Sequence, residues 1–474
     1  MSVSYPSTNA PLDDDPSEDA DRHSGGGGHR DSSEAPLTLT ETAPRSLGLL
    51  DQFGLWGNLG VSLTGFAYAY LILHPSADLQ LSASAAITAI IVGSALGGLI
   101  FGTVLVLGAR TGAPAMVLLR GVLGARASYL PTVLNIAQCV GWAVIELSVI
   151  AQGLQALSRG HLAHWWCVVI AGAVTTALTI KPLGAIRALR KYVSVLVVLA
   201  LIVFVIGLLR QPATPTSGSW AGFWLAADVP IAFTISFVPL GPDYSRHSRS
   251  GRAAFAGGFF GYGATQIICL LMGVMALNRL SELQQDTNGV FNLFLSLPLG
   301  LIAFGVLVLR ETDQSFANVY STAISLQNIA PRWDRRLLTT AIGVLATAAA
   351  LTVDTSTYQN FLYLIGAIFI SLSGVLVALW LRTAGLGLDL SSRAPTRPGM
   401  LLGWLLGFVA YQLINPGSIP GWGDLWTKVD ESLHTLGHPW LSASLTSFVI
   451  ALLVALPFAG SQAAPSGQLA ERRP

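Results

Sequence analysis

Long apolar stretches alternate with short polar segments between residues 47 and 460 of this chain. A helix of about 20 apolar residues is long enough to cross a lipid bilayer. Such stretches predict twelve membrane-spanning helices, at residues 50–73, 84–109, 129–157, 164–180, 192–209, 223–243, 254–277, 297–327, 337–352, 359–381, 400–415 and 441–459. We therefore expect an all-α polytopic membrane protein.

The composition supports this class and excludes others. Of the 474 residues, 52% are apolar and only 11% are charged, whereas a soluble protein carries about a quarter charged residues. The net charge of +1 argues against nucleic acid as a partner, because a nucleic-acid-binding protein needs a basic face. The three cysteines lie in apolar stretches, so we expect neither a disulfide framework nor a metal site.

The two ends of the chain differ from the rest. Residues 1–46 hold nine acidic residues, three arginines and a run of glycines at 25–28. Such a segment cannot bury apolar surface, so we expect a disordered acidic tail. It lacks the basic start and apolar core of a signal peptide. Residues 461–474 are expected to form a second, short polar tail.

The basic residues between the spans predict the orientation of the chain. With the N-terminus inside, the cytoplasmic loops hold sixteen Lys and Arg residues and the outer loops hold four. Because cytoplasmic loops are enriched in Lys and Arg, we expect a multi-pass protein of the plasma (inner) membrane with both termini in the cytoplasm. If one span in the middle of the chain were missed, the loops after it would change sides and this bias would be lost. The bias therefore also supports the number of spans.

Three residues of the third span suggest a binding face. Gln138, Trp142 and Glu146 are spaced four residues apart, so they lie along one side of a helix. An indole ring can stack on a flat heterocycle while an amide and a carboxyl group bind its edge. Charged groups are costly inside a membrane and are usually functional there. The alternative is a polar stripe that packs one helix against another.

The sixth span contains residues that interrupt a helix. Pro239, Gly241 and Pro242 follow one another closely, and a regular helix does not continue through such a sequence. Transporters place substrate sites at helix breaks of this kind, which makes the nearby Ser236 a candidate hydrogen-bonding group. The alternative is a simple kink, or a helix that ends early near the cytoplasm.

The first span is rich in glycine. Gly57 and Gly60 flank the polar residue Asn58, and glycines at this density weaken a helix and free its carbonyl groups. Freed carbonyls can bind a coupling cation. Close packing of helices through small residues is the competing explanation.

The eighth span carries an unusual number of polar groups. Arg310 and Asp313 lie in it together with Thr312 and Gln314, which is difficult to reconcile with a helix that faces lipid. We expect these residues to line a solvated path, with Asp313 as a proton or cation site. We further hypothesise that Arg310 neutralises Glu146 across the cavity.

Several short motifs occur in an order known from one family. They are GARTG at 108–112, LRGVLGARASYLP at 119–131, GW at 141–142, DYSR at 243–246, NVY at 318–320 and QNI at 327–329. Because of these motifs, the chain resembles the nucleobase–cation symporter-1 family, in particular its bacterial cytosine permeases. The opening segment 44–58, Glu146 and the run 310–313 are most similar to its hydroxymethylpyrimidine transporters.

The resemblance implies twelve helices, arranged as a five-plus-five inverted repeat of the leucine-transporter type with two extra helices. The ten-helix transport core would then cover residues 47–382, and the additional helices residues 383–460. It also implies that a substrate stacks on Trp142 between the broken first and sixth helices and the third and eighth helices. The coupling cation would be held by first-helix carbonyls and eighth-helix hydroxyl groups.

The chain departs from the family pattern at three places. The aromatic residue that stacks on substrate in the sixth helix falls on Thr234, with Phe233 and Phe237 on either side. The third-helix glutamine of the cytosine permeases falls on Cys139. Their paired eighth-helix threonines fall near Asp313 and Gln314, and an ionisable Asp313 suits proton coupling at least as well as sodium coupling.

These observations predict a symporter for a pyrimidine such as cytosine or hydroxymethylpyrimidine, driven by H+ or Na+ and operating by alternating access. Uracil, allantoin or a hydantoin are alternative substrates, and a passive channel or a membrane-embedded enzyme are alternative functions. We expect no cofactor, and the only partners expected are the substrate and the lipid bilayer. The sequence does not determine the oligomeric state.

Overall fold

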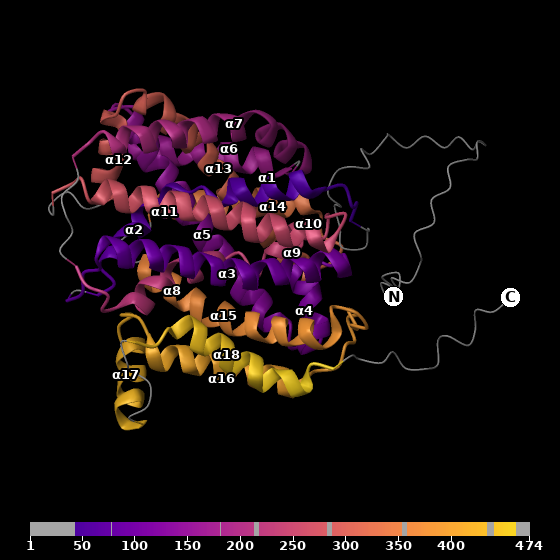
Figure 1. Ribbon diagram of the computed structural model, residues 1–474. Helices are drawn as coiled ribbons and strands as arrows, with labels where there is room; N and C mark the ends of the chain where they lie inside the picture. The colour runs from indigo at the N-terminus through magenta and orange to yellow at the C-terminus, as the bar shows by residue number, and fades with distance from the viewer. Residues whose placement is uncertain are drawn as a thin grey trace, which may run out of the picture.

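The computed structural model describes residues 43–460, apart from 77, 181, 213–217, 282–286, 353–357 and 434–439. The predicted tails therefore lie outside the described residues, except for positions 43–46. Within the described part of the chain, every regular element is a helix. The helices run in roughly parallel layers across the molecule (Figure 1).

Each of the twelve predicted spans coincides with a helix or with consecutive helices. Nine spans are single helices: α3 (Ala83–Thr111), α5 (Tyr129–Leu157), α6 (His164–Ile180), α7 (Pro182–Leu209), α13 (Gly300–Ile329), α14 (Arg335–Ala350), α15 (Tyr358–Thr383), α16 (Pro398–Ile414) and α18 (Ala443–Ala455), which continues as η4 (Leu456–Phe458). The seventh span consists of α10 (Gly251–Ala256), the π-helical turn η1 (Gly257–Tyr262) and α11 (Gly263–Leu277).

The first and sixth spans are broken. The first consists of α1 (Leu49–Gly60) and α2 (Leu63–Leu73), and the sixth of α8 (Phe223–Ile235) and α9 (Gly241–Ser245). In the sixth span the interruption coincides with the closely spaced prolines and glycine, as predicted. Paired broken helices are the feature around which substrate sites of many transporters are built.

Three short helices were not predicted from the sequence. They are α4 (Ala115–Leu123), α12 (Thr287–Ser296) and α17 (Trp422–Leu433), all in segments expected to be loops. With 9 to 12 residues each, they are too short to cross a bilayer, at 1.5 Å of rise per residue. A search for long apolar stretches does not detect them for this reason.

Segments near both ends of the described chain lie at the same end of the bundle as the basic loops. The backbone nitrogen of Leu47 donates to the carbonyl oxygen of His247 at 2.9 Å. The Arg397 guanidinium donates to the carbonyl oxygen of Gly460 at 2.9 Å, and Arg110 donates to Ala384 in the same way. Segments that lie on the same side of the bundle require an even number of spans between them. The twelve spans predicted from the sequence meet this requirement.

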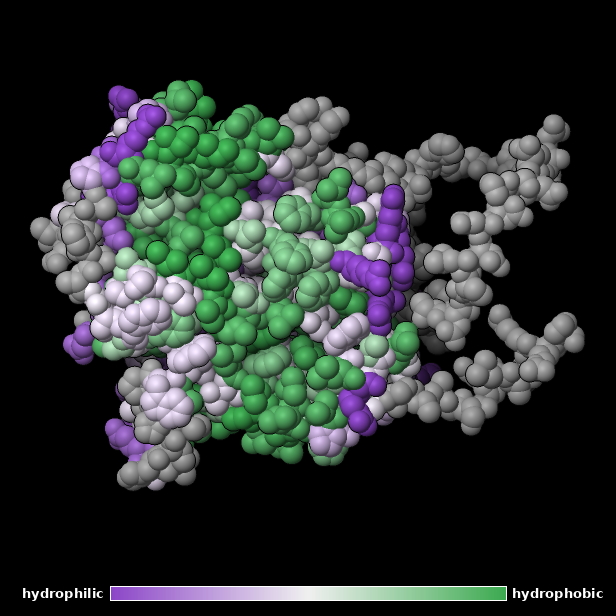
Figure 2. All heavy atoms as spheres, viewed as in Figure 1, coloured by the Kyte–Doolittle hydropathy of each residue, from purple (hydrophilic) through white to green (hydrophobic). Residues whose placement is uncertain are grey.

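The outside of the bundle is apolar around its middle. Figure 2 shows hydrophobic residues over the centre of this face, and hydrophilic residues gathered toward its two ends. Large apolar side chains are exposed on several spans, including Val195 and Leu209 of α7, Val344 of α14 and Leu405 of α16. In a soluble protein so much exposed apolar surface would be unfavourable, whereas here it matches the hydrocarbon core of a membrane.

A buried carboxylate connects the last span to the sixth. Asp228 of α8 accepts hydrogen bonds from the Ser442 hydroxyl group and from the backbone nitrogen of Ala443, the latter at 2.8 Å. Both donors belong to the first turn of α18, whose unpaired N–H groups favour an anion. This intramembrane carboxylate therefore has a structural role.

Replacing Asp228 by alanine is expected to lower the free energy of unfolding by about 2–3 kcal/mol, because buried donors lose their acceptor. Thermal unfolding in detergent measures the loss. Asp334→Ala is the matched control, since Asp334 caps α14 in the same way but in an exposed loop, where we expect only about 1 kcal/mol. Equal losses in the two variants would contradict a buried anchor at Asp228.

Candidate substrate-binding site

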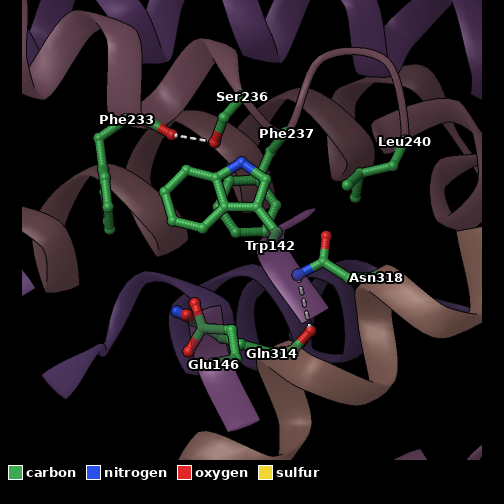
Figure 3. Close-up of a pocket in the computed structure, with 8 residues that line it drawn as sticks. All are labelled: Trp142, Glu146, Phe233, Ser236, Phe237, Leu240, Gln314 and Asn318. Carbon is green, nitrogen blue, oxygen red and sulfur yellow. Dashed lines mark hydrogen bonds between the residues drawn. The ribbon is translucent and has the colours of Figure 1, made fainter. Parts of the chain in front are cut away.

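A small cavity lies inside the bundle, between α5, α13 and the break in the sixth span. It is lined by Trp142, Glu146, Phe233, Ser236, Phe237, Leu240, Gln314 and Asn318. In the view of Figure 3, Trp142 lies between the four sixth-span residues and the polar side chains of Glu146, Gln314 and Asn318. The cavity is thus aromatic on one side and polar on the other.

The break in the sixth span exposes backbone groups beside this cavity. The Ser236 hydroxyl group donates to the carbonyl oxygen of Phe233 at 2.7 Å. The Gln138 amide nitrogen of α5 donates to the carbonyl oxygen of Ser236 at 2.9 Å and to Asn135 at 3.2 Å. Gln138 therefore ties the third span to the helix break, and it is not among the residues that line the cavity.

Trp142 is the central aromatic residue of the cavity. Its ring makes edge contacts with Phe233 and Phe361, at centroid distances of 6.0 and 5.6 Å. The indole nitrogen is buried and has no hydrogen-bond partner within the described protein. A buried N–H group normally finds an acceptor, so a ligand acceptor in the cavity would satisfy it.

The polar side of the cavity combines a carboxyl group with two amides. Glu146 is 2% exposed, and its Oε2 atom has no hydrogen-bond partner among the described residues. The Asn318 side chain donates to the backbone oxygen of Gln314 at 3.2 Å. Together with the Ser236 hydroxyl group, these side chains present both donors and acceptors to a small ligand.

The break in the first span is held by side chains of α13. The carbonyl oxygens of Asn58, Leu59 and Val61, here called the α1 carbonyl cluster, end the first half of the span. Arg310 donates to the oxygen of Asn58, and Gln314 donates to those of Leu59 and Val61 at 2.7 and 3.3 Å. A cation and an amide from one helix therefore bind the carbonyl groups at the C-terminal end of α1, where the oxygen of Asn58 also accepts from the backbone nitrogen of Val61.

The second half of the first span is bound by a carboxylate of the same helix. Glu311 accepts hydrogen bonds from the Ser62 hydroxyl group and from the backbone nitrogen of Leu63, each at 3.0 Å. Adjacent residues of α13 thus place a positive group at the C-terminal end of α1 and a negative group at the N-terminal end of α2. Both charges oppose the helix dipoles favourably.

The structure brings six of the predicted site residues together around the cavity. Five were predicted to bind substrate: Trp142, Glu146, Phe233, Ser236 and Phe237. The sixth, Gln314, was predicted to bind the coupling ion, and it contributes to the cavity wall as well as to the α1 carbonyl cluster.

The other predicted residues lie outside the cavity lining. Asn58 donates through its side chain to Ser194 at 2.8 Å, and the Thr312 hydroxyl group donates to the oxygen of Leu309 within its own helix. Asp313 is buried on α13. Gln138 and Arg310 bind backbone carbonyls at the two helix breaks, as described above.

Gly57 and Gly60 serve close packing between the first and seventh spans. A Cβ atom at Gly60 would lie 2.6 Å from the carbonyl oxygen of Tyr262 and would also clash with the hydroxyl oxygen of Thr265. Gly57 faces the backbone of Gly261 in the same interface. This is the packing explanation that the sequence left open beside cation binding.

The hypothesis of an ion pair between Arg310 and Glu146 is corrected by the structure. The carboxylate within 4 Å of the Arg310 guanidinium is that of Glu311, at 3.7 Å. Neighbouring residues on a helix rarely face each other, but here both side chains turn toward the break between α1 and α2. Sequence spacing alone does not show that the break lies opposite them.

Sequence reasoning missed two lining residues, Leu240 and Asn318, and did not assign a role to Glu311. Asn318 lies four residues after Gln314 on α13, so the helical period could have placed it on the same face. Leu240 belongs to the irregular segment of the sixth span, which has no such period. Thr234, at the family's stacking position, instead bonds to Pro230 and Gln266.

Broken apolar helices around a small aromatic and polar cavity define the chain as a membrane transport protein. The family described as permeases for cytosine/purines, uracil, thiamine and allantoin matches residues 44–390. The chain belongs to this family, which confirms the resemblance carried by its motifs. This is a family of permeases and not of enzymes.

Two curated relatives are permeases of Saccharomyces cerevisiae. Purine-cytosine permease FCY21 is 29% identical over 157 residues, which cover 32% of this chain and 29% of the relative. Purine-cytosine permease FCY2 is 25% identical over 248 residues, which cover 47% of this chain and 46% of the relative. The chain thus matches less than half the length of either relative.

Two solved structures of one transporter share the fold. Mhp1, a nucleobase-cation-symport-1 family transporter in a closed conformation with bromovinylhydantoin bound, has a TM-score of 0.67 at 18% identity and covers 90% of this chain and 94% of its own. Its inward-facing conformation has a TM-score of 0.64 at 17% identity, with coverage of 90% and 92%. The similarity to Mhp1 confirms the predicted fold class.

Proposed function

We propose that this protein imports a pyrimidine nucleobase-type substrate, such as cytosine or hydroxymethylpyrimidine, by cation symport. The observation that carries the proposal is the cavity at the sixth-span break, where Trp142 lies beside Glu146 and Asn318. The family to which the chain belongs, described by its cytosine, purine, uracil, thiamine and allantoin permeases, supports the substrate class.

The lining residues suit a flat heterocycle with mixed hydrogen-bonding groups. The Trp142 indole offers a stacking plane and a free N–H donor. An aminopyrimidine carries an amino donor beside a ring-nitrogen acceptor, and the Glu146 carboxyl group can accept from the first. Asn318 and Ser236 would complete the contacts to the ring edge.

Alternating access would proceed by movement of one group of helices against another around this cavity. The first and sixth spans are broken beside α13 and α5 respectively, so their halves can tilt separately. No covalent bond is made or broken, and the role of the side chains is to bind and orient the substrate. The basic loops support a plasma-membrane location with both termini in the cytoplasm.

Counterflow uptake into proteoliposomes that contain the purified chain tests this function. Vesicles loaded with unlabelled base are expected to take up labelled cytosine or hydroxymethylpyrimidine faster than protein-free vesicles. Competition by uracil, allantoin, hydantoins and purines then ranks the alternatives. Accumulation against a gradient that an uncoupler abolishes would exclude a passive channel. If none of the bases produced counterflow, the proposed substrate class would be wrong.

A further inference from the structure

The place expected for a coupling metal ion is taken by a side chain of the protein. Where a transmembrane helix is interrupted, the last carbonyl groups of the first half point to no intrahelical donor, and transporters use them to bind Na+. Here the α1 carbonyl cluster accepts hydrogen bonds from Arg310 and Gln314. Arg310 is 1% exposed, and its guanidinium is permanently charged.

A second carboxyl group lies next to the one that Arg310 contacts. The buried Glu146 carboxyl group, on α5, interacts electrostatically with both Arg310 and the Glu311 carboxyl group on α13. Since Glu146 lines the cavity and Glu311 binds Ser62 and Leu63, this pair joins the substrate site to the break in the first span. Among the described residues, Tyr262 of η1 and Cys269 of α11 also interact with this cluster.

The charges of this cluster balance only with a proton present. Arg310 contributes one positive charge, and Glu146 and Glu311 would contribute two negative charges in a water-poor interior. Two neighbouring carboxylates that are both buried do not both remain ionised beside a single cation, so one of them carries a proton.

We propose that Arg310 is a resident cation that replaces a coupling metal ion at the α1 carbonyl cluster, and that a proton carried by Glu146 or Glu311 is the ion that drives transport. This inference rests on the proposed symport function. The proton would bind from the side on which the substrate enters and leave to the cytoplasm with it. Removal of the proton would place two negative charges beside the base and weaken its binding.

The driving ion is tested in proteoliposomes that contain the wild-type chain and the base identified by counterflow. Accumulation is expected to follow an inwardly directed proton gradient and to be equal in sodium and choline buffers. It is expected to fall as the external pH rises, since fewer pairs carry the proton. Accumulation that requires sodium, or that does not respond to the proton gradient, would overturn the proposal.

The residues are tested with Glu311→Gln. Glutamine keeps one of the two acceptor oxygens that bind Ser62 and Leu63 but cannot carry the exchangeable proton. The ratio of proton-driven accumulation to counterflow is expected to fall at least tenfold. Asp228→Asn is the matched control, because Asp228 is an equally buried carboxylate in contact with Ser442 and away from Arg310, and its ratio should stay within twofold of wild type. An unchanged ratio in Glu311→Gln would contradict the assignment.

A measurement without substrate separates this inference from the proposed function. The thermal unfolding temperature of the purified chain is compared in sodium chloride and choline chloride at equal ionic strength. If Arg310 and Gln314 fill the α1 carbonyl cluster, sodium has no site there and the unfolding temperature should be the same in both salts. A sodium ion that bound only the folded state would instead raise the unfolding temperature. A specific rise in the unfolding temperature with sodium would overturn the proposal, whichever bases the protein transports.

Discussion

Replacing Trp142 by alanine is expected to lower the affinity for the transported base by about 5- to 150-fold. Stacking of a base on an aromatic side chain contributes about 1–3 kcal/mol, and each 1.4 kcal/mol corresponds to a factor of ten. The half-saturation concentration of counterflow uptake measures the change. Trp142→Phe, which keeps a smaller ring, is expected to lose less than the alanine variant.

Trp404→Ala provides the matched control for this prediction. Trp404 of α16 is 7% exposed against 4% for Trp142, and its indole nitrogen donates to the backbone of Ile368, away from the cavity. It is expected to reduce stability and protein yield without raising the half-saturation concentration. An affinity in Trp142→Ala equal to that of the control would show that the base does not stack on Trp142.

Replacing Arg310 by alanine is expected to lower the free energy of unfolding by about 3–5 kcal/mol. Removal of one partner of a buried ion pair leaves the other charge uncompensated, in this case the Glu311 carboxylate, and removes the donor to Asn58. Thermal unfolding of the purified protein measures the effect. Arg310→Lys keeps the charge and is expected to recover part of the loss, although a single ammonium group does not reproduce a guanidinium.

Arg279→Ala is the control for Arg310. Arg279 also donates to backbone carbonyls, those of Leu208 and Met275 at 2.6 Å each, but it lies at the end of the seventh span and is partly exposed. Its removal is expected to cost about 1–2 kcal/mol. A loss in Arg310→Ala no greater than this would contradict the role of Arg310 in holding the broken first span.

Much of the fold could be predicted because a membrane imposes a simple requirement on the chain. Each crossing needs a long apolar helix whose backbone groups are paired internally. The break in the sixth span was also predictable, since Pro239 and Pro242 remove backbone donors wherever they occur. The short helix α4 was not, because its nine residues are stabilised by neighbouring helices and leave no long apolar signal.

The candidate site was predictable where a single helix determines it. Trp142 and Glu146 are four residues apart, so any helix through them places both on one side. Asn318 follows Gln314 at the same spacing. It was not predicted because the sequence does not show which side of α13 lines the cavity. Leu240 lies in irregular backbone, where no period relates sequence to direction.

The sequence by itself determined the class of protein, the twelve apolar helices, the break at the sixth span and the face that carries Trp142 and Glu146. Those properties follow from composition and from local backbone geometry. Only the tertiary structure decided that Arg310 and Gln314 meet the α1 carbonyl cluster, that Glu311 binds the start of α2, and that Gly60 serves packing. The physical reason is that the helical period determines on which side of its own helix a residue lies. Which residue of another helix it contacts depends on how the separate helices pack together.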